Sequence, residues 1–138
     1  MMPTVYFPSF EDAEIVELDF LAPVGESCRV KLLVDSGFTG HSSIVLGDDT
    51  DDLIWAVMDP VSVTGALHGE QNRAWVTFRI PEIGFQRTSI AILTDLAPLS
   101  LPHDIRGMVG LSFLRHFTRW GAEQSNDAWR FFLAVSDE

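Results

Sequence analysis

The sequence predicts a mainly β domain with one or two short helices. Apolar residues alternate with polar residues in several short runs, which is the period expected of strands with one buried face. Clusters of turn-forming residues separate these runs, and only residues 53–58 and 111–117 resemble helices. The 138 residues are enough for one ordinary domain but not for two lobes, so we expect 1–138 to be a single domain.

The first half of the chain begins with a predicted hairpin. Residues 14–20 alternate apolar and acidic side chains, residues 22–27 have the composition of a turn, and residues 28–34 form a second apolar run. This second run ends at Asp35. Residues 43–46 predict another short strand.

A short helix is predicted next, over residues 53–58. Four aspartates at 48–52 precede this apolar stretch, and acidic residues favour a helix N-terminus because they complement its dipole. Pro60 would then end the helix.

The second half predicts a pair of hairpins, then a helix and one last hairpin. Residues 61–93 alternate around a glycine-bounded loop at 65–69 and a turn at 81–84. Helical spacing follows over residues 111–117, and a last hairpin is predicted on either side of residues 124–127. Its final strand, 130–135, is apolar on both faces, so both faces need cover.

The composition excludes several classes of function. The net charge of −11, from 20 acidic and 9 basic residues, argues against nucleic acid and against an anionic membrane surface as partners. One cysteine, Cys28, allows no intrachain disulfide. The chain shows neither a signal peptide nor a transmembrane run, so a cytoplasmic location is the expectation.

No metal or cofactor motif stands out. The histidines form no HExxH pair, there is no CxxC, and the acidic run 48–52 lacks the register of a calcium loop. Neither a GxSxG elbow nor a glycine-rich nucleotide loop occurs. We therefore expect no metal and no cofactor.

One carboxylate stands out by its position. Asp35 follows the apolar segment Leu32–Val34, where burying a charge is costly unless partners hold it. Ser36 offers a hydroxyl, and Gly37 lets backbone N–H groups approach closely. The same residues also fit an Asx-type turn that caps a strand, so the tripeptide alone leaves both interpretations open.

Two motifs taken together carry a family resemblance. Asp35-Ser36-Gly37 after two apolar residues, and Val109-Gly110 leading into the helical residues 111–114, resemble the two signatures of the retropepsin-like, single-lobed aspartic peptidases. The likeness is greatest to the bacterial-type branch, and the order of parts agrees from about residue 13 to residue 135. The resemblance implies a closed β-barrel of hairpins that forms half of a pepsin-like active site.

The resemblance also implies how the chain would work. Such peptidases need two facing carboxylates that share one proton, and this chain has one Asp-Ser-Gly. A homodimer with its twofold axis at the site would supply the second Asp35, and the terminal strands would interleave at the interface. Asp35 would be catalytic, Ser36 would brace the two loops, and Gly37 would bond the backbone of a polypeptide substrate.

Further site residues follow only from the resemblance. The glycine-tipped loop would be a flap that closes over the peptide, and Phe38 would line the pocket beside the acid. The substrate-binding residues expected on this basis are Phe38, Gly65, Ala66, Leu67, His68 and Gly69.

The chain departs from the family pattern at three positions. Phe38 stands where many relatives have alanine or serine, which would narrow the pocket or make it more apolar. Thr39 and Leu111 stand where retroviral members have an acidic residue and an arginine, so that ion pair cannot be carried over. Two alternatives therefore stay open: a catalytically inactive binding or dimerisation module of the same fold, and a plain β-barrel adaptor without a cleft.

Overall fold

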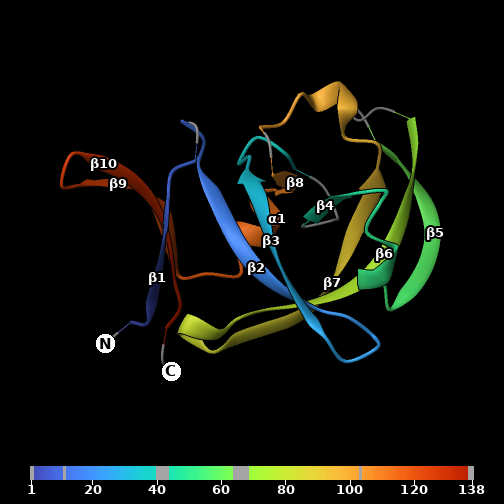
Figure 1. The fold of residues 1–138 in the computed structure, drawn as a ribbon, viewed down its shortest axis with the longest axis horizontal. Coiled ribbons are helices and arrows are strands. Elements are labelled where there is room, and N and C mark those ends of the chain that lie inside the picture. The colour runs from blue at the N-terminus through green and yellow to red at the C-terminus, as the bar shows by residue number, and fades with distance from the viewer. Residues whose placement is uncertain (1, 11, 40–43, 64–68, 103, 137–138) are drawn as a thin grey trace.

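The computed structural model describes residues 2–10, 12–39, 44–63, 69–102 and 104–136. It is mainly β (Figure 1). The strands are β1 (Thr4–Pro8), β2 (Ile15–Leu21), β3 (Ser27–Val34), β4 (Ile44–Gly47), β5 (Ala56–Val63), β6 (Gly69–Ile80), β7 (Phe85–Thr94), β8 (Ile105–Val109), β9 (Arg119–Ser125) and β10 (Ala128–Ala134). The helical elements are the 3₁₀ turns η1 (Asp51–Leu53), η3 (Pro81–Ile83) and η4 (Ala97–Leu99) and the short α1 (Leu111–Leu114).

Six of the described strands close into a barrel. Their order is β2-β3-β8-β4-β7-β6, and pairing of β2 with β6 around Phe20 and Phe78 completes the ring. β5 adds to the outer edge of β6. A mainly β domain built on a closed barrel is therefore confirmed.

Strand β8 lies between two strands that follow one another in the sequence. β8 is parallel to β3, with Val109 beside Val34, and antiparallel to β4, with Val109 beside Ile44. The chain leaves β3 at Asp35 and returns as β4 on the far side of β8. Gly107 allows this close approach, because a Cβ there would collide with the Val45 carbonyl oxygen.

The predicted hairpins are present. Residues 14–20 and 28–34 correspond to the antiparallel β2 and β3, and the third predicted strand is β4. The sequential pairs β5–β6, β6–β7 and β9–β10 match the remaining predicted hairpins.

The helix predicted over 53–58 is wrong. η1 ends at Leu53, and from Ala56 the chain is strand β5. The Trp55 amide donates to the Trp75 carbonyl at 2.9 Å, and Ala56 pairs with Trp75. Pairing with β6 thus outweighs the local helical preference, and Pro60 fits because β5 is an edge strand with an irregular register there.

The helix predicted over 111–117 is shorter than expected. α1 covers only Leu111–Leu114, with α-type bonds from the amides of Leu114 and Arg115. The amides of His116 and Phe117 instead make bonds of the 3₁₀ type, which end the helix.

A second sheet contains the chain ends, in the order β1-β10-β9. β10 is central, so both of its edges are hydrogen-bonded within the chain. Phe131 and Leu133 point into the core, while Phe132 lies on the opposite face beside the ring of Tyr6. The doubly apolar residues 130–135 are therefore buried or half-buried within their own chain.

Two apolar clusters lie on opposite faces of the barrel wall. The main core fills the barrel and continues under the terminal sheet, where it includes Val5, Phe7, Phe131 and Leu133. Alternate residues of the same strands point outward into a smaller cluster. This outer cluster consists of Val45, Ile92 and Met108, with the partly buried Leu33, Phe38, Leu96 and Leu99 packed against it.

Candidate active site

The Asp35 loop is held by backbone hydrogen bonds. The Asp35 amide donates to the Val109 carbonyl at 2.9 Å, and the Phe38 amide donates to the Asp35 carbonyl at 3.0 Å. The Gly37 amide donates to Asp35 Oδ1 at 3.0 Å, which forms the Asx turn considered above. This bond orients the carboxylate while Asp35, Ser36 and Gly37 stay exposed at the surface.

The second motif contacts the first directly. The Leu111 amide donates to the Phe38 carbonyl at 2.9 Å, so the start of α1 is tied to the Asp35 loop. Gly110 is buried, and a Cβ at this position would lie 2.5 Å from both the carbonyl oxygen and Cδ2 of Phe38. Only glycine therefore allows the two motifs to pack at this distance.

Phe38 does not cover Asp35. Its ring packs against Gly110 and into the outer cluster, where it is half-buried. Leu33, two residues before Asp35, belongs to the same cluster. Two half-buried apolar side chains, Leu33 and Phe38, thus flank Asp35 in the sequence, and together they are called the apolar wall.

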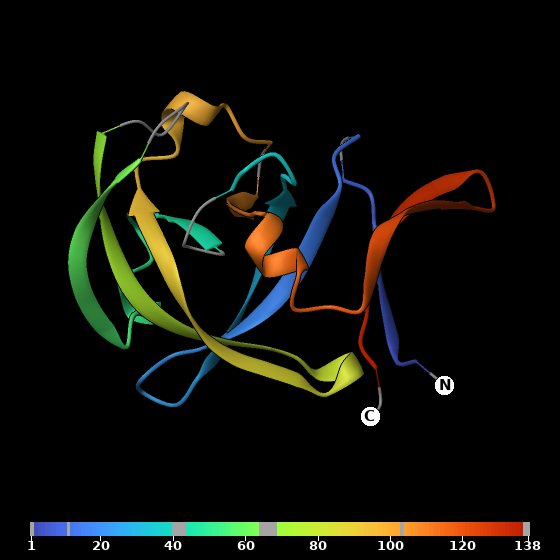
Figure 2. The same ribbon diagram turned by 180° about the vertical axis from the view of Figure 1, so that it is seen from behind.

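The flap prediction is described only in part. Gly69 begins β6 with a φ of +102°, a conformation that favours glycine. Gly65, Ala66, Leu67 and His68 lie outside the described residues. Strand β5 ends and the barrel strand β6 begins on the same side of the barrel as the C-terminal end of β3 (Figures 1 and 2).

A second acidic side chain near the loop was not singled out from the sequence. The Val34 amide donates to the Glu14 carbonyl at 2.9 Å, and the Ser9 hydroxyl donates to Glu14 Oε1 at 3.1 Å. Glu14 Oε2 is buried without a hydrogen-bond partner among the described residues, which is costly for a carboxylate. The sequence shows Glu14 only as the first polar residue of an alternating run.

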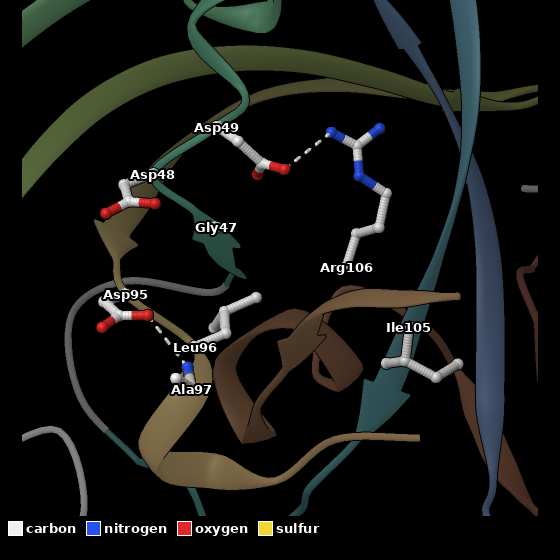
Figure 3. Close-up of a pocket in the computed structure, with 8 residues that line it drawn as sticks. All are labelled: Gly47, Asp48, Asp49, Asp95, Leu96, Ala97, Ile105 and Arg106. Atoms are coloured by element: carbon white, nitrogen blue, oxygen red, sulfur yellow. Dashed lines mark hydrogen bonds and ion pairs between the residues drawn. The ribbon is translucent and has the colours of Figure 1, made fainter. Parts of the chain in front are cut away.

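A shallow pocket of about 280 Å³ lies elsewhere (Figure 3). It sits where β4 ends and β8 begins, at the opposite end of these strands from Asp35. Arg106 lies 3.8 Å from Asp49, and Asp95 Oδ1 accepts from the Ala97 amide at 3.0 Å. Two of the three aspartates that line the pocket thus have partners within the chain. The described residues contain no group of three side chains suited to a metal ion.

No family model, no curated protein and no solved structure matches the chain. No helix in the described ranges combines the length and the apolar character that crossing a bilayer requires.

Proposed function

We propose that this chain is one subunit of a homodimeric aspartic endopeptidase with a retropepsin-like fold, and that Asp35 is its catalytic residue. The observation that carries the proposal is the junction of the two motifs. Residues far apart in the sequence meet at Asp35: its amide bonds to Val109, and Phe38 bonds to Leu111 across a contact that only Gly110 permits.

The exposure of Asp35 fits this role. A lone surface aspartate cannot share a proton, but two copies that meet at this loop would bring two carboxylates together. One carboxylate takes a proton from water, whose oxygen attacks the peptide carbonyl carbon. The other, protonated, donates to the carbonyl oxygen. The C–N bond then breaks as a proton passes to the leaving amine.

The outer cluster suggests the kind of peptide that would bind. Leu33 and Phe38 are half-buried members of this cluster and flank Asp35 in the sequence. An extended substrate lying across Asp35 would place a side chain against this wall, where an apolar group removes more apolar surface from water than a polar one. We therefore expect cleavage beside apolar residues.

The test uses Asp35→Asn with Asp52→Asn, an exposed aspartate of η1, as the matched control. A peptide library is incubated with each purified protein between pH 3 and 7, and the products are identified by mass spectrometry. Proton transfer by a positioned carboxylate contributes about 100-fold or more, so Asp35→Asn should lose at least that factor, whereas Asp52→Asn should match the parent.

A mixing experiment tests the shared dyad. Asp35→Asn subunits added to a fixed amount of parent protein form mixed dimers with one carboxylate, so activity should fall as the variant is added. Parent-like cleavage by Asp35→Asn, or no cleavage by a parent protein that is dimeric, would refute the proposal. The second result would favour the inactive dimerisation module.

A further inference from the structure

The hairpin of β9 and β10 extends beyond the body of the barrel (Figures 1 and 2). Its register places Trp129 opposite Gln124, Phe131 opposite Ala122, and Leu133 opposite Trp120, so all six side chains share one face. On this face Phe131 and Leu133 are 3% and 0% exposed, whereas Trp129 is 54% and Trp120 37% exposed. An apolar face that begins in the core thus continues past the part that its own chain covers.

The other face of the same sheet is covered by its own side chains. The Arg130 guanidinium lies 3.7 Å from the centre of the Tyr6 ring and is held by Glu123 at 2.6 Å. Arg119 lies over Phe132 at 5.4 Å. The rings of Tyr6 and Phe132 on that face therefore already have cation partners within the chain. Within the described ranges the indole of Trp129 makes no hydrogen bond, ring contact or cation contact.

Backbone contacts connect the β9–β10 hairpin to the strand that leads into Asp35. The Ser9 amide donates to the Trp129 carbonyl at 3.1 Å, and Phe10 is bridged to Ala13. The next residue, Glu14, accepts the Val34 amide beside Asp35. A short series of backbone contacts therefore connects Trp129 to the Asp35 loop. The C-terminal end of β3 and the tip of the β9–β10 hairpin both lie in the upper half of Figure 1.

We infer that the β9–β10 hairpin is a dimerisation arm, whose exposed face at Trp129 and Trp120 packs against a second copy of this chain. The inference rests on the proposed function, because a site with one carboxylate is incomplete without a second subunit. A twofold axis beside Asp35 would present the same arm from both copies, as an isologous interface requires.

The arm replaces the interleaved strands that the family resemblance implies. Both edges of β10 are already paired, to β1 and to β9, so β10 cannot accept a partner strand. Exposed tryptophans are typical anchors of interfaces, because a large ring is desolvated at little cost in conformational freedom. The two indoles and the loops around Asp35 would together form the contact.

The experiment measures dimer dissociation by sedimentation for the parent, Trp129→Glu, Trp129→Phe and Trp55→Glu. Trp55 is the matched control: it is 48% exposed, and its Nε1 donates to the Leu21 carbonyl, at the end of the barrel away from Asp35. Loss of an anchor tryptophan should weaken the dimer about 30-fold or more for Trp129→Glu. Trp129→Phe should restore most of the affinity, and Trp55→Glu should dimerise as the parent does.

If Trp129→Glu does not fold, oxidative footprinting of the parent protein tests the same interface. Oxidation of Trp129 is measured by mass spectrometry above and below the dimer dissociation constant, and it should slow at the higher concentration while oxidation of Trp55 stays constant. Three results would overturn the proposal that the hairpin is a dimerisation arm. They are equal oxidation of Trp129 at both concentrations, a parent-like dimer of folded Trp129→Glu, and a parent protein that stays monomeric.

The outcomes test the dimerisation arm and the peptidase activity independently of each other. Asp35→Asn should dimerise like the parent, because Asp35 is not on the arm. If the arm holds the dimer and no peptide is cleaved, the proposed function fails and the arm stands. If the parent cleaves peptides and Trp129→Glu dimerises normally, the arm fails and the proposed function stands.

Discussion

From the contact between Gly110 and Phe38 we predict that Gly110→Ala destabilises the protein. The added Cβ would lie 2.5 Å from the Phe38 carbonyl oxygen and 2.5 Å from Cδ2 of its ring, well inside van der Waals contact. The ring can rotate away, but the carbonyl belongs to the Asp35 loop and accepts the Leu111 amide at 2.9 Å. Relief therefore requires the loop and the start of α1 to separate.

The expected cost follows from two effects. Overpacking a tight site costs about 1–3 kcal/mol, and weakening the bond from Leu111 to Phe38 adds about 1 kcal/mol. Gly110→Ala should therefore lower the free energy of unfolding by about 2–4 kcal/mol, measured by urea denaturation. In the proposed peptidase it should also reduce cleavage, since it moves the loop that positions Asp35.

Gly121→Ala is the control. Its Cβ would meet the Phe132 ring at 3.5 and 3.6 Å, which is ordinary contact, so stability should change by less than about 0.5 kcal/mol. The double variant with Phe38→Ala separates the two collisions, because it removes the ring and leaves the carbonyl. If Gly110→Ala unfolds at the same urea concentration as the parent, the close packing of the two motifs is refuted.

Two further predictions concern Phe38 and His116. Phe38→Ala removes a half-buried ring from the outer cluster and should lower the free energy of unfolding by about 2 kcal/mol in urea denaturation. It should also shift library cleavage towards larger apolar side chains, and an unchanged profile would exclude Phe38 from the substrate wall. His116 is only partly buried, and this partial burial, with the charge of Arg87 as the smaller cause, lowers its pKa below the ordinary 6.5. The unfolded chain therefore binds more protons, and the contribution of His116 to stability decreases as the pH falls from about 6.5 through the folded pKa. An NMR titration of the imidazole should give a pKa below 6.5, and Arg87→Gln should raise it only in part; a parent pKa of 6.5 or above contradicts this.

Strands and turns were predictable where local pattern and tertiary position agree. The alternation in β2 and β3 predicts their register, because one face of each strand lies in the core. The same local reasoning failed at residues 53–58, where a helix-like composition lies beside Trp75 of β6 and forms strand β5 instead. The winning pairing is non-local, so no local window could contain it.

Some features of the candidate site were likewise predictable from the sequence, and others were not. The sequence by itself determined that one carboxylate follows an apolar strand, that a glycine-containing motif comes later, and that a mainly β domain surrounds them, since these depend on residue type and period. Only the tertiary structure decided that Gly110 packs on Phe38, that Phe38 turns into the outer cluster and leaves Asp35 exposed, and that β10 is paired on both edges. These features depend on which distant segments lie side by side. That arrangement is set by how the whole chain buries its apolar surface, which no single stretch of sequence records.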